Sequence, residues 1–473
     1  MILAHAFGAR YDLPIPLSLF VVGGGVVVLL SFMLVARRTP ADDAPVPDSA
    51  QTPSQATFHP IGGTVGLVIL AFLVWVGFTG AQSLSENMLP TSFWLLTWIA
   101  IPLSCGLAGD WTRSLNPFAS LAKLADRPAL RTALLGSAEP VSWRRWLGYW
   151  PAAVIFFLTA CGELVFNVTL TIPHNTALAL VIYAFVSTVG GLLFGDSWLR
   201  NGEMFSVLFA TWGRLGYWRF GAPGRRGFAG GLEEPFDSSL SRISFTLLLL
   251  ISVNFDGLLA TPSWSHLEDR LPGGLPTHPG RLETFRLLTF LALAVAIAIL
   301  FGAFAVASAR AGRQRISAAG GLANLLPSLV PIAFGYLLVH NLQYLVVNSQ
   351  LMLPLIGNPV GKESWPLHLP YPFNDSYEVN RTTPSASFYW YSGVAVIIVV
   401  HVIAVLIAHR RLAHLETSAN NARRTEYPWL AAMAGYTMLS LWLIAQPLVK
   451  EGSAQAPKPS AAAVASQTAT GGR

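Results

Sequence analysis

The sequence predicts an all-α protein, a polytopic transmembrane helix bundle of about ten spans with the N-terminus and the C-terminus outside. Of its 473 residues, 53% are hydrophobic and only 11% are charged, whereas a soluble globular protein carries about 25% charged residues. Its mean hydropathy is +0.51. Ten apolar stretches have the roughly 20 residues that crossing a hydrocarbon layer of about 30 Å requires. The basic residues alternate between the loops as the positive-inside rule requires.

Composition also excludes several classes of protein. The two cysteines, Cys105 and Cys161, lie inside apolar runs, so a secreted disulfide scaffold is excluded. The formal net charge is +6, but no basic run is interleaved with aromatic residues in the manner of a nucleic-acid surface. We therefore expect the lipid bilayer, and no nucleic acid, as a partner.

The ten predicted spans follow one another along the chain. In order they are Leu17–Ala36, Ile61–Gly80, Ser92–Gly109, Leu147–Asn167, Thr176–Gly195, Ile243–Thr261, Phe285–Ser308, Leu322–Val347, Phe388–His409 and Trp429–Leu448. Several ends carry Trp or Tyr, which favour the membrane–water interface.

The loop charges predict the orientation. If the N-terminus lies outside, the inward loops carry 21 of the 30 Lys and Arg residues. Every short inward loop is then richer in Arg than its outward neighbours, which is the positive-inside pattern. Most of the basic residues are Arg rather than Lys, a bias typical of GC-rich bacterial genomes. We expect a multi-pass protein of a bacterial inner membrane.

The chain divides into three parts. Residues 1–14 form a short outer segment, residues 15–448 form the bundle, and residues 449–473 are rich in Ala, Ser and Thr without periodicity. This last composition predicts a disordered tail. Within the bundle, residues 348–387 make a long outer loop with several aromatic residues.

Two inward loops resemble each other. The third span is followed by GDWTRSLNPFASLAKLADR and the fifth by GDSWLRNGEMFSVLFATWGR. We interpret them as a parallel repeat, in which each span is followed by an amphipathic helix in the inner interface, near residues 116–135 and 202–216. The repeat serves interfacial anchoring or, alternatively, an inner binding site.

Ionisable and amide side chains inside spans mark the candidate functional site, because each charged group costs about 2.5–3.5 kcal/mol to insert. With the predicted orientation they all lie between the midplane and the outer surface. They are Glu163, Asn167, His174, Asn254, Asp256, His340, Asn341, Gln343, Tyr344 and His401, with His5 before the first span.

These side chains allow more than one interpretation. Two carboxylates with several imidazoles make a ligand set for Zn²⁺ or another divalent metal ion, which would also neutralise the carboxylates. The sequence has no closely spaced metal-binding motif such as HExxH or CxxC. The metal site is therefore inferred only from the similar depth of these side chains in the membrane. Alternatively, they form a proton relay, as intramembrane Asp, Glu and His often do, or unrelated hydrogen bonds between helices.

The opening stretch AHAFGARYDLPIPLSLFVVGG (Ala4–Gly25) and the two repeated loops resemble a family of bacterial integral membrane proteins, the fenitrothion hydrolases. The resemblance implies hydrolysis of an aryl dialkyl phosphorothioate, an apolar small molecule, to a dialkyl thiophosphate and a nitrophenol. A divalent metal would supply the nucleophile by lowering the pKa of bound water from 15.7 to about 7.

Under this hypothesis the polar residues divide into three roles. Glu163 and Asp256 are catalytic; the metal ligands are His340, His401, His174 and His5; and the substrate contacts are Asn167, Asn254, Asn341 and Tyr344. The competing hypotheses are a proton- or ion-coupled transporter that uses the same side chains, and a non-catalytic accessory subunit. A homologous or second membrane subunit is a further expected partner.

Overall fold

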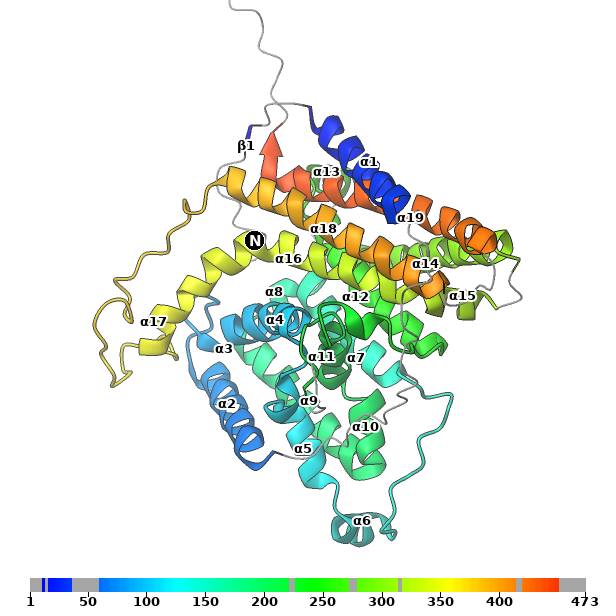
Figure 1. Cartoon of the computed structure of the whole chain (residues 1–473). Helices are drawn as coiled ribbons and strands as arrows, with labels where there is room; N and C mark the ends of the chain where they lie inside the picture. Colours follow the sequence, from blue (N-terminus) through cyan, green and yellow to red (C-terminus); the bar gives the residue numbers. More distant parts are fainter. Residues whose placement is uncertain are drawn as a thin grey trace, which may run out of the picture.

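The computed structural model describes residues 11–12, 16–35, 59–220, 226–271, 279–313, 317–413 and 419–450. Nearly all of the regular structure in these ranges is helical (Figure 1). The all-α prediction is therefore confirmed for the described part of the chain.

In chain order, the helices and strands are β1 (Tyr11–Asp12), α1 (Leu17–Val35), α2 (Pro60–Thr79), α3 (Met88–Pro90), η2 (Thr91–Ala100), α4 (Ile101–Ala108), η3 (Thr112–Ser114), α5 (Pro117–Ala125), α6 (Pro128–Leu135), α7 (Trp150–Leu164), α8 (Asn167–Leu170), α9 (Pro173–Phe194), α10 (Asp196–Asn201), α11 (Met204–Gly213), η4 (Gly230–Leu232), α12 (Leu240–Leu259), α13 (Pro262–Arg270), α14 (Pro279–Ala311), α15 (Ala318–Leu325), η6 (Leu326–Ser328), α16 (Leu329–Asn348), η7 (Ser349–Leu351), α17 (Met352–Gly357), α18 (Ala386–Ala413), α19 (Ala419–Leu448) and β2 (Val449–Lys450).

Each of the ten predicted spans coincides with a helix or a run of helices. Within the described residues, eight of these are long and apolar enough to cross a membrane. The other two predicted spans, α1 and α7, form shorter apolar helices. A membrane protein with several spanning helices follows from this; the number of ten crossings stays a prediction.

The two ends of the described chain lie side by side. Strand β1 pairs in parallel with β2, with Tyr11 opposite Val449 and Asp12 opposite Lys450. Helix α1 packs against α19 and α18. This pairing puts both ends on one side of the bundle, as an even number of spans requires, but it does not reveal which side is outside.

Helices α12 and α16 form the centre of the bundle. Helix α12 packs against α7, α14, α16 and α19, so it joins the lower and upper groups of helices in Figure 1. In the most apolar 18-residue stretch of residues 319–357, 83% of the residues are buried inside the protein. In the corresponding stretch of α2 the share is 22%. Since both stretches are strongly apolar, the difference indicates that α16 meets protein while α2 presents its side chains to lipid.

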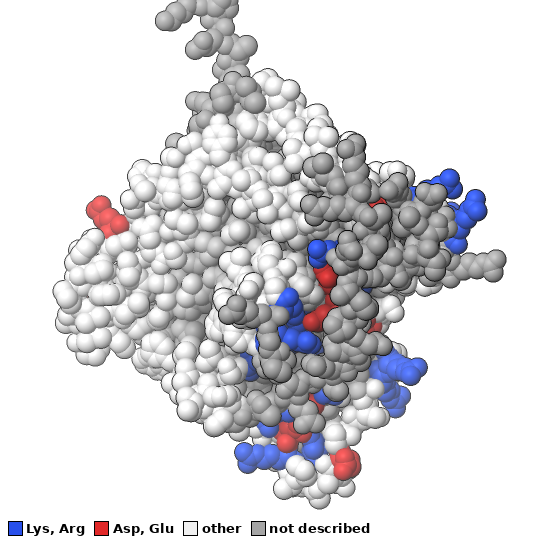
Figure 2. Space-filling view, in the orientation of Figure 1, with Lys and Arg blue, Asp and Glu red and all other residues white. Residues whose placement is uncertain are grey.

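Charged residues are unevenly distributed over the surface. On the face drawn in Figure 2, Lys and Arg lie in the middle, on the right-hand side and at the bottom, whereas the left-hand edge shows none. A one-sided distribution of this kind is what the positive-inside rule produces.

Two short helices begin in the middle of the bundle rather than at its edge. The side chains just before α5 and α11 are Asn116 and Glu203, and each caps its own helix by accepting backbone N–H groups. The hydroxyl of Tyr183, at the middle of the 22-residue helix α9, donates to Glu203. The N-termini of α5 and α11 therefore reach half-way along α9.

The two caps also contact each other. The amide nitrogen of Asn116 donates to Glu203 Oε2 at 2.8 Å, and the rings of Phe118 and Phe205 stack with centroids 5.4 Å apart. These pairs occupy equivalent positions in NPF (116–118) and EMF (203–205), so the predicted repeat brings its own two copies together. Glu203 is fully buried and accepts four donors in all.

The structure corrects the prediction of an interfacial helix near residues 202–216. Eight of the ten residues of α11 are buried, and the helix packs against α4 and α7. The physical reason is visible in its sequence, MFSVLFATWG, which is apolar around the whole circumference. A helix without a polar face belongs inside the protein.

The predicted orientation can be tested with single cysteines at exposed loop positions. We expect Ser376→Cys, in the loop before α18, to react with a membrane-impermeant maleimide on intact cells. Ser137→Cys, in the loop after α6, should react only after permeabilisation, because it lies on the predicted inner side. Both positions are exposed, whereas the native cysteines are buried. The opposite labelling pattern would reverse the orientation.

The polar contact between the two half-helices should hold the fold together. Glu203→Gln keeps the size of the side chain but puts amide N–H donors among four existing donors, and we expect a loss of about 2 kcal/mol in the free energy of unfolding. Glu139→Gln, on an exposed loop, is the control. Equal melting temperatures in detergent for the two variants would show that the contact is dispensable.

Candidate functional site

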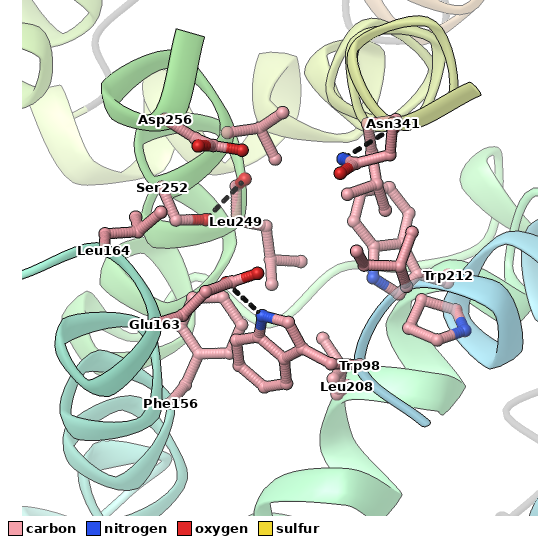
Figure 3. A pocket seen from close by; sticks show the side chains of 14 residues that line it. Trp98, Phe156, Glu163, Leu164, Leu208, Trp212, Leu249, Ser252, Asp256 and Asn341 are labelled. Atoms are coloured by element: carbon pink, nitrogen blue, oxygen red, sulfur yellow. Dashed lines mark hydrogen bonds between the residues drawn. The ribbon is translucent and has the colours of Figure 1, made fainter. Parts of the chain in front are cut away.

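Two adjoining cavities lie where α7, α12 and α16 meet. The smaller has a volume of about 40 Å³ and the larger about 150 Å³. Both are lined by Glu163, Leu164, Asp256 and Asn341, and we name the two together the carboxylate pocket. The view in Figure 3 shows the two carboxylates and Asn341 directed into the smaller cavity from three helices.

Glu163 is placed by the early end of α7. The helix stops at Leu164, and the backbone N–H groups of Val165 and Phe166 both bond to the carbonyl of Cys161. The carboxylate therefore lies in the last turn, where it faces the pocket. The indole nitrogen of Trp98 donates to its Oε2 at 2.5 Å, which satisfies one acceptor in an otherwise apolar wall.

Trp98 belongs to an unusual helix. In η2 the hydrogen bonds join residues five apart, and the N–H of Ile101 continues the pattern by bonding to the carbonyl of Leu96. This wider π-helix is rare and occurs frequently at functional sites. It carries Trp94 and Trp98, which line the larger and the smaller cavity respectively.

Asp256 is paired with His340. The imidazole Nε2 lies 2.9 Å from Asp256 Oδ2, and the ring of Tyr336 stacks on the imidazole with centroids 5.9 Å apart. The side chain of Asp256 is 21% exposed and that of His340 only 2%. The carboxylate therefore faces the pocket, and the imidazole supports it from behind.

Several predicted residues do meet at the pocket. Asn341 lines both cavities, and Asn167 and Tyr344 line the larger one. The Nδ2 of Asn341 donates to the carbonyl of Leu337 at 3.1 Å. With Glu163 and Asp256, five of the predicted side chains thus share one pocket.

Other predicted residues lie elsewhere. Asn254 donates to the hydroxyl of Tyr436, on a different side of α12 from Asp256. His401 is fully buried in α18 and its Nδ1 lies 2.7 Å from the carbonyl of Ile397. His174 is exposed and meets the ring of Phe78 edge-on. His5 lies outside the described residues.

These positions bear on the predicted metal. Within the described ranges, no group of three or more His, Cys, Asp or Glu side chains is arranged to hold a metal ion. His401 and His174 do not line either cavity. A Zn²⁺ site takes at least three protein ligands, so the described residues of the pocket do not fit one.

Three contributors to the site carry no clear signal in the sequence. Trp98 lies in an apolar run, where an indole does not stand out. Arg286 lines the larger cavity and Glu268 binds it with two contacts, 2.7 Å to Nε and 2.9 Å to Nη2, but its position near a span end is typical of a loop charge. Trp212 on α11 lines the smaller cavity, although its segment was predicted to lie in the interface.

The pocket has a marked charge asymmetry. The described residues that line the smaller cavity include two carboxylates and no Lys, Arg or His. The larger cavity adds Arg286, whose charge is balanced by Glu268. The end of the pocket is aromatic: Trp98 stacks on Phe156 with centroids 5.3 Å apart. The site is thus an acidic pocket with an aromatic end.

Comparison with known proteins found no matching family model, no matching curated protein and no matching solved structure. The resemblance to the fenitrothion hydrolases stays a prediction from the sequence.

Proposed function

We propose that the protein is a proton-coupled membrane transporter of small molecules, in which Glu163 and Asp256 take up and release the protons. One observation carries the proposal: two carboxylates from different membrane helices face the same cavity. Ionisable groups placed between membrane helices commonly form ion and proton pathways. Glu163 and Asp256 line a cavity, whereas the carboxylate of Glu203 is surrounded by four hydrogen-bond donors.

The path of the pocket supports this function. The larger cavity is lined by Asn167, Thr171 and Ala260, which follow or end the helices on the predicted outer side. The adjoining smaller cavity is lined by Trp98 and Trp212. Transporters commonly bind their substrates near the middle of the membrane, and a polar lining that extends toward the predicted outer side supports a path to such a site.

A short helix borders the smaller cavity. Leu208 and Trp212 belong to α11, a half-helix that is anchored at its N-terminus through Glu203. Transporters often form their substrate sites from discontinuous helices near the middle of the membrane. Movement of α11 would open the pocket toward the predicted inner side.

Hydrolysis of an organophosphorus triester is the second candidate, and the Asp256–His340 pair favours it. An Asp supported by an imidazole can act as general base: it takes a proton from water, the water oxygen bonds to phosphorus, and the bond to the aryl oxygen breaks with release of nitrophenolate. The volume argues against it, since a cavity of about 150 Å³ holds one benzene-sized ring, which is smaller than fenitrothion.

Transport can be tested without knowing the substrate. Vesicles containing the purified protein are incubated with a small-molecule extract of bacterial cells, with and without a pH gradient, and their contents are measured by mass spectrometry. We expect at least one compound to accumulate only with the gradient. Glu163→Gln and Asp256→Asn should abolish accumulation, and Asp375→Asn, on an exposed loop, should not. Equal contents in vesicles without protein would contradict transport.

Hydrolysis has its own assay. Purified protein in detergent is mixed with fenitrothion, and nitrophenolate is measured by absorbance with chelator, with added Zn²⁺ and with neither. If the second candidate is correct, turnover occurs and Asp256→Asn abolishes it. Turnover that needs Zn²⁺ would locate missing ligands outside the described residues. No turnover in any condition would remove this candidate.

A further inference from the structure

We propose that the carboxylate pocket binds a small organic cation, an amine or a quaternary ammonium compound. The proposal rests on the transport function proposed above and names its class of substrate. The first argument is charge. Glu163 and Asp256 both line the two cavities, and the described lining of the smaller cavity holds no Lys, Arg or His. An anion would meet repulsion there, and a cation would be attracted.

The second argument is the aromatic wall. Trp98, Phe156 and Trp212 line the smaller cavity, and Trp94 and Tyr344 line the larger one. A cation close to the face of an aromatic ring is attracted by the ring, more strongly when the cation is desolvated, and aromatic cages are suited to alkylated ammonium groups. Carboxylates alone would also suit a metal ion, but aromatic rings would not.

The third argument is the lack of metal geometry. A Ca²⁺ or Mg²⁺ site needs about six oxygen ligands around one point. The described residues supply no group of three acidic, thiol or imidazole ligands. Trp98 donates to Glu163 and His340 contacts Asp256, so each carboxylate already has a protein partner on one oxygen. An alkylated ammonium needs diffuse charge and apolar contact instead of a full ligand shell.

Size narrows the class further. The larger cavity, at about 150 Å³, matches in volume a cavity of about 150 Å³ that holds benzene. A cation of similar size, such as choline or benzylammonium, fits this volume. Among the described residues, Arg286 is the one cation that lines the larger cavity, and the two-contact pair with Glu268 balances its charge.

Calorimetry with a matched pair of ligands tests the inference. Choline and its neutral carbon isostere 3,3-dimethyl-1-butanol have nearly the same shape and differ in charge. We expect choline to bind the purified full-length protein in detergent about tenfold more tightly than the isostere, which corresponds to about 1.4 kcal/mol. Equal binding of the two, or no binding of choline, would overturn the inference.

Variants separate charge from folding. Glu163→Gln and Asp256→Asn should each weaken choline binding about tenfold, and Trp98→Leu should reduce the preference for choline over the isostere. Glu268→Gln, which removes the counter-charge of Arg286, should weaken choline binding while leaving both carboxylates in place. His174→Ala, at an exposed position, is the control. Unchanged binding in both carboxylate variants would also overturn the inference.

The outcomes for ligand class and for transport are distinct. Choline binding without accumulation of any compound in vesicles would retain the cation site and remove the transport function. Accumulation of other compounds without choline binding would retain transport and remove the cation. The melting temperature of each variant is measured as well. Lost binding with an unchanged melting temperature shows that the site, and not the fold, has been affected.

Discussion

The cost of placing carboxylates among membrane helices determines the arrangement of this protein. Each such group costs about 2.5–3.5 kcal/mol to insert, so it needs hydrogen-bond donors or access to water. Glu163 receives the indole N–H of Trp98, and Asp256 lies against His340. These contacts join η2 to α7 and α12 to α16, and the two carboxylates share the remaining space between the four helices. The pocket is therefore a consequence of how the charges are accommodated.

A third carboxylate, that of Glu203, is stabilised entirely by hydrogen bonds and does not face the pocket. Glu203 is fully buried and surrounded by four donors, two of which are backbone N–H groups at the start of α11. It lines neither cavity of the carboxylate pocket, and the N-terminus of a helix favours negative charge. We conclude that Glu203 serves the fold, by joining the two half-helices of the repeat, whereas Glu163 and Asp256 face a space in which a ligand can be accommodated.

The sequence was sufficient for the fold class and for part of the site, and the reasons for the difference are physical. Each span predicted from hydropathy coincides with a helix or a run of helices, and eight of these, within the described residues, are long and apolar enough to cross a membrane. Depth along the helices grouped Glu163, Asp256 and Asn341, which line the same cavity. The depth of a residue in the membrane, however, does not determine on which side of its helix the side chain lies. Asn254 and Asp256 are two residues apart, which is about 200° around a helix, so only one of them can face the pocket. Trp98 could not be foreseen, because an indole in an apolar run looks like any other hydrophobic residue.

Positions 163 and 256 face each other across one pocket, and chemical cross-linking tests this most directly. In a background in which Cys105 and Cys161 are replaced by Ser, Glu163→Cys is combined with Asp256→Cys and treated with a short bifunctional thiol reagent. We predict an intact mass increased by one bridging linker. The matched control combines Glu163→Cys with Asn254→Cys, which should not be bridged. Bridging of the control pair, or two separately modified thiols at 163 and 256, would contradict the shared pocket.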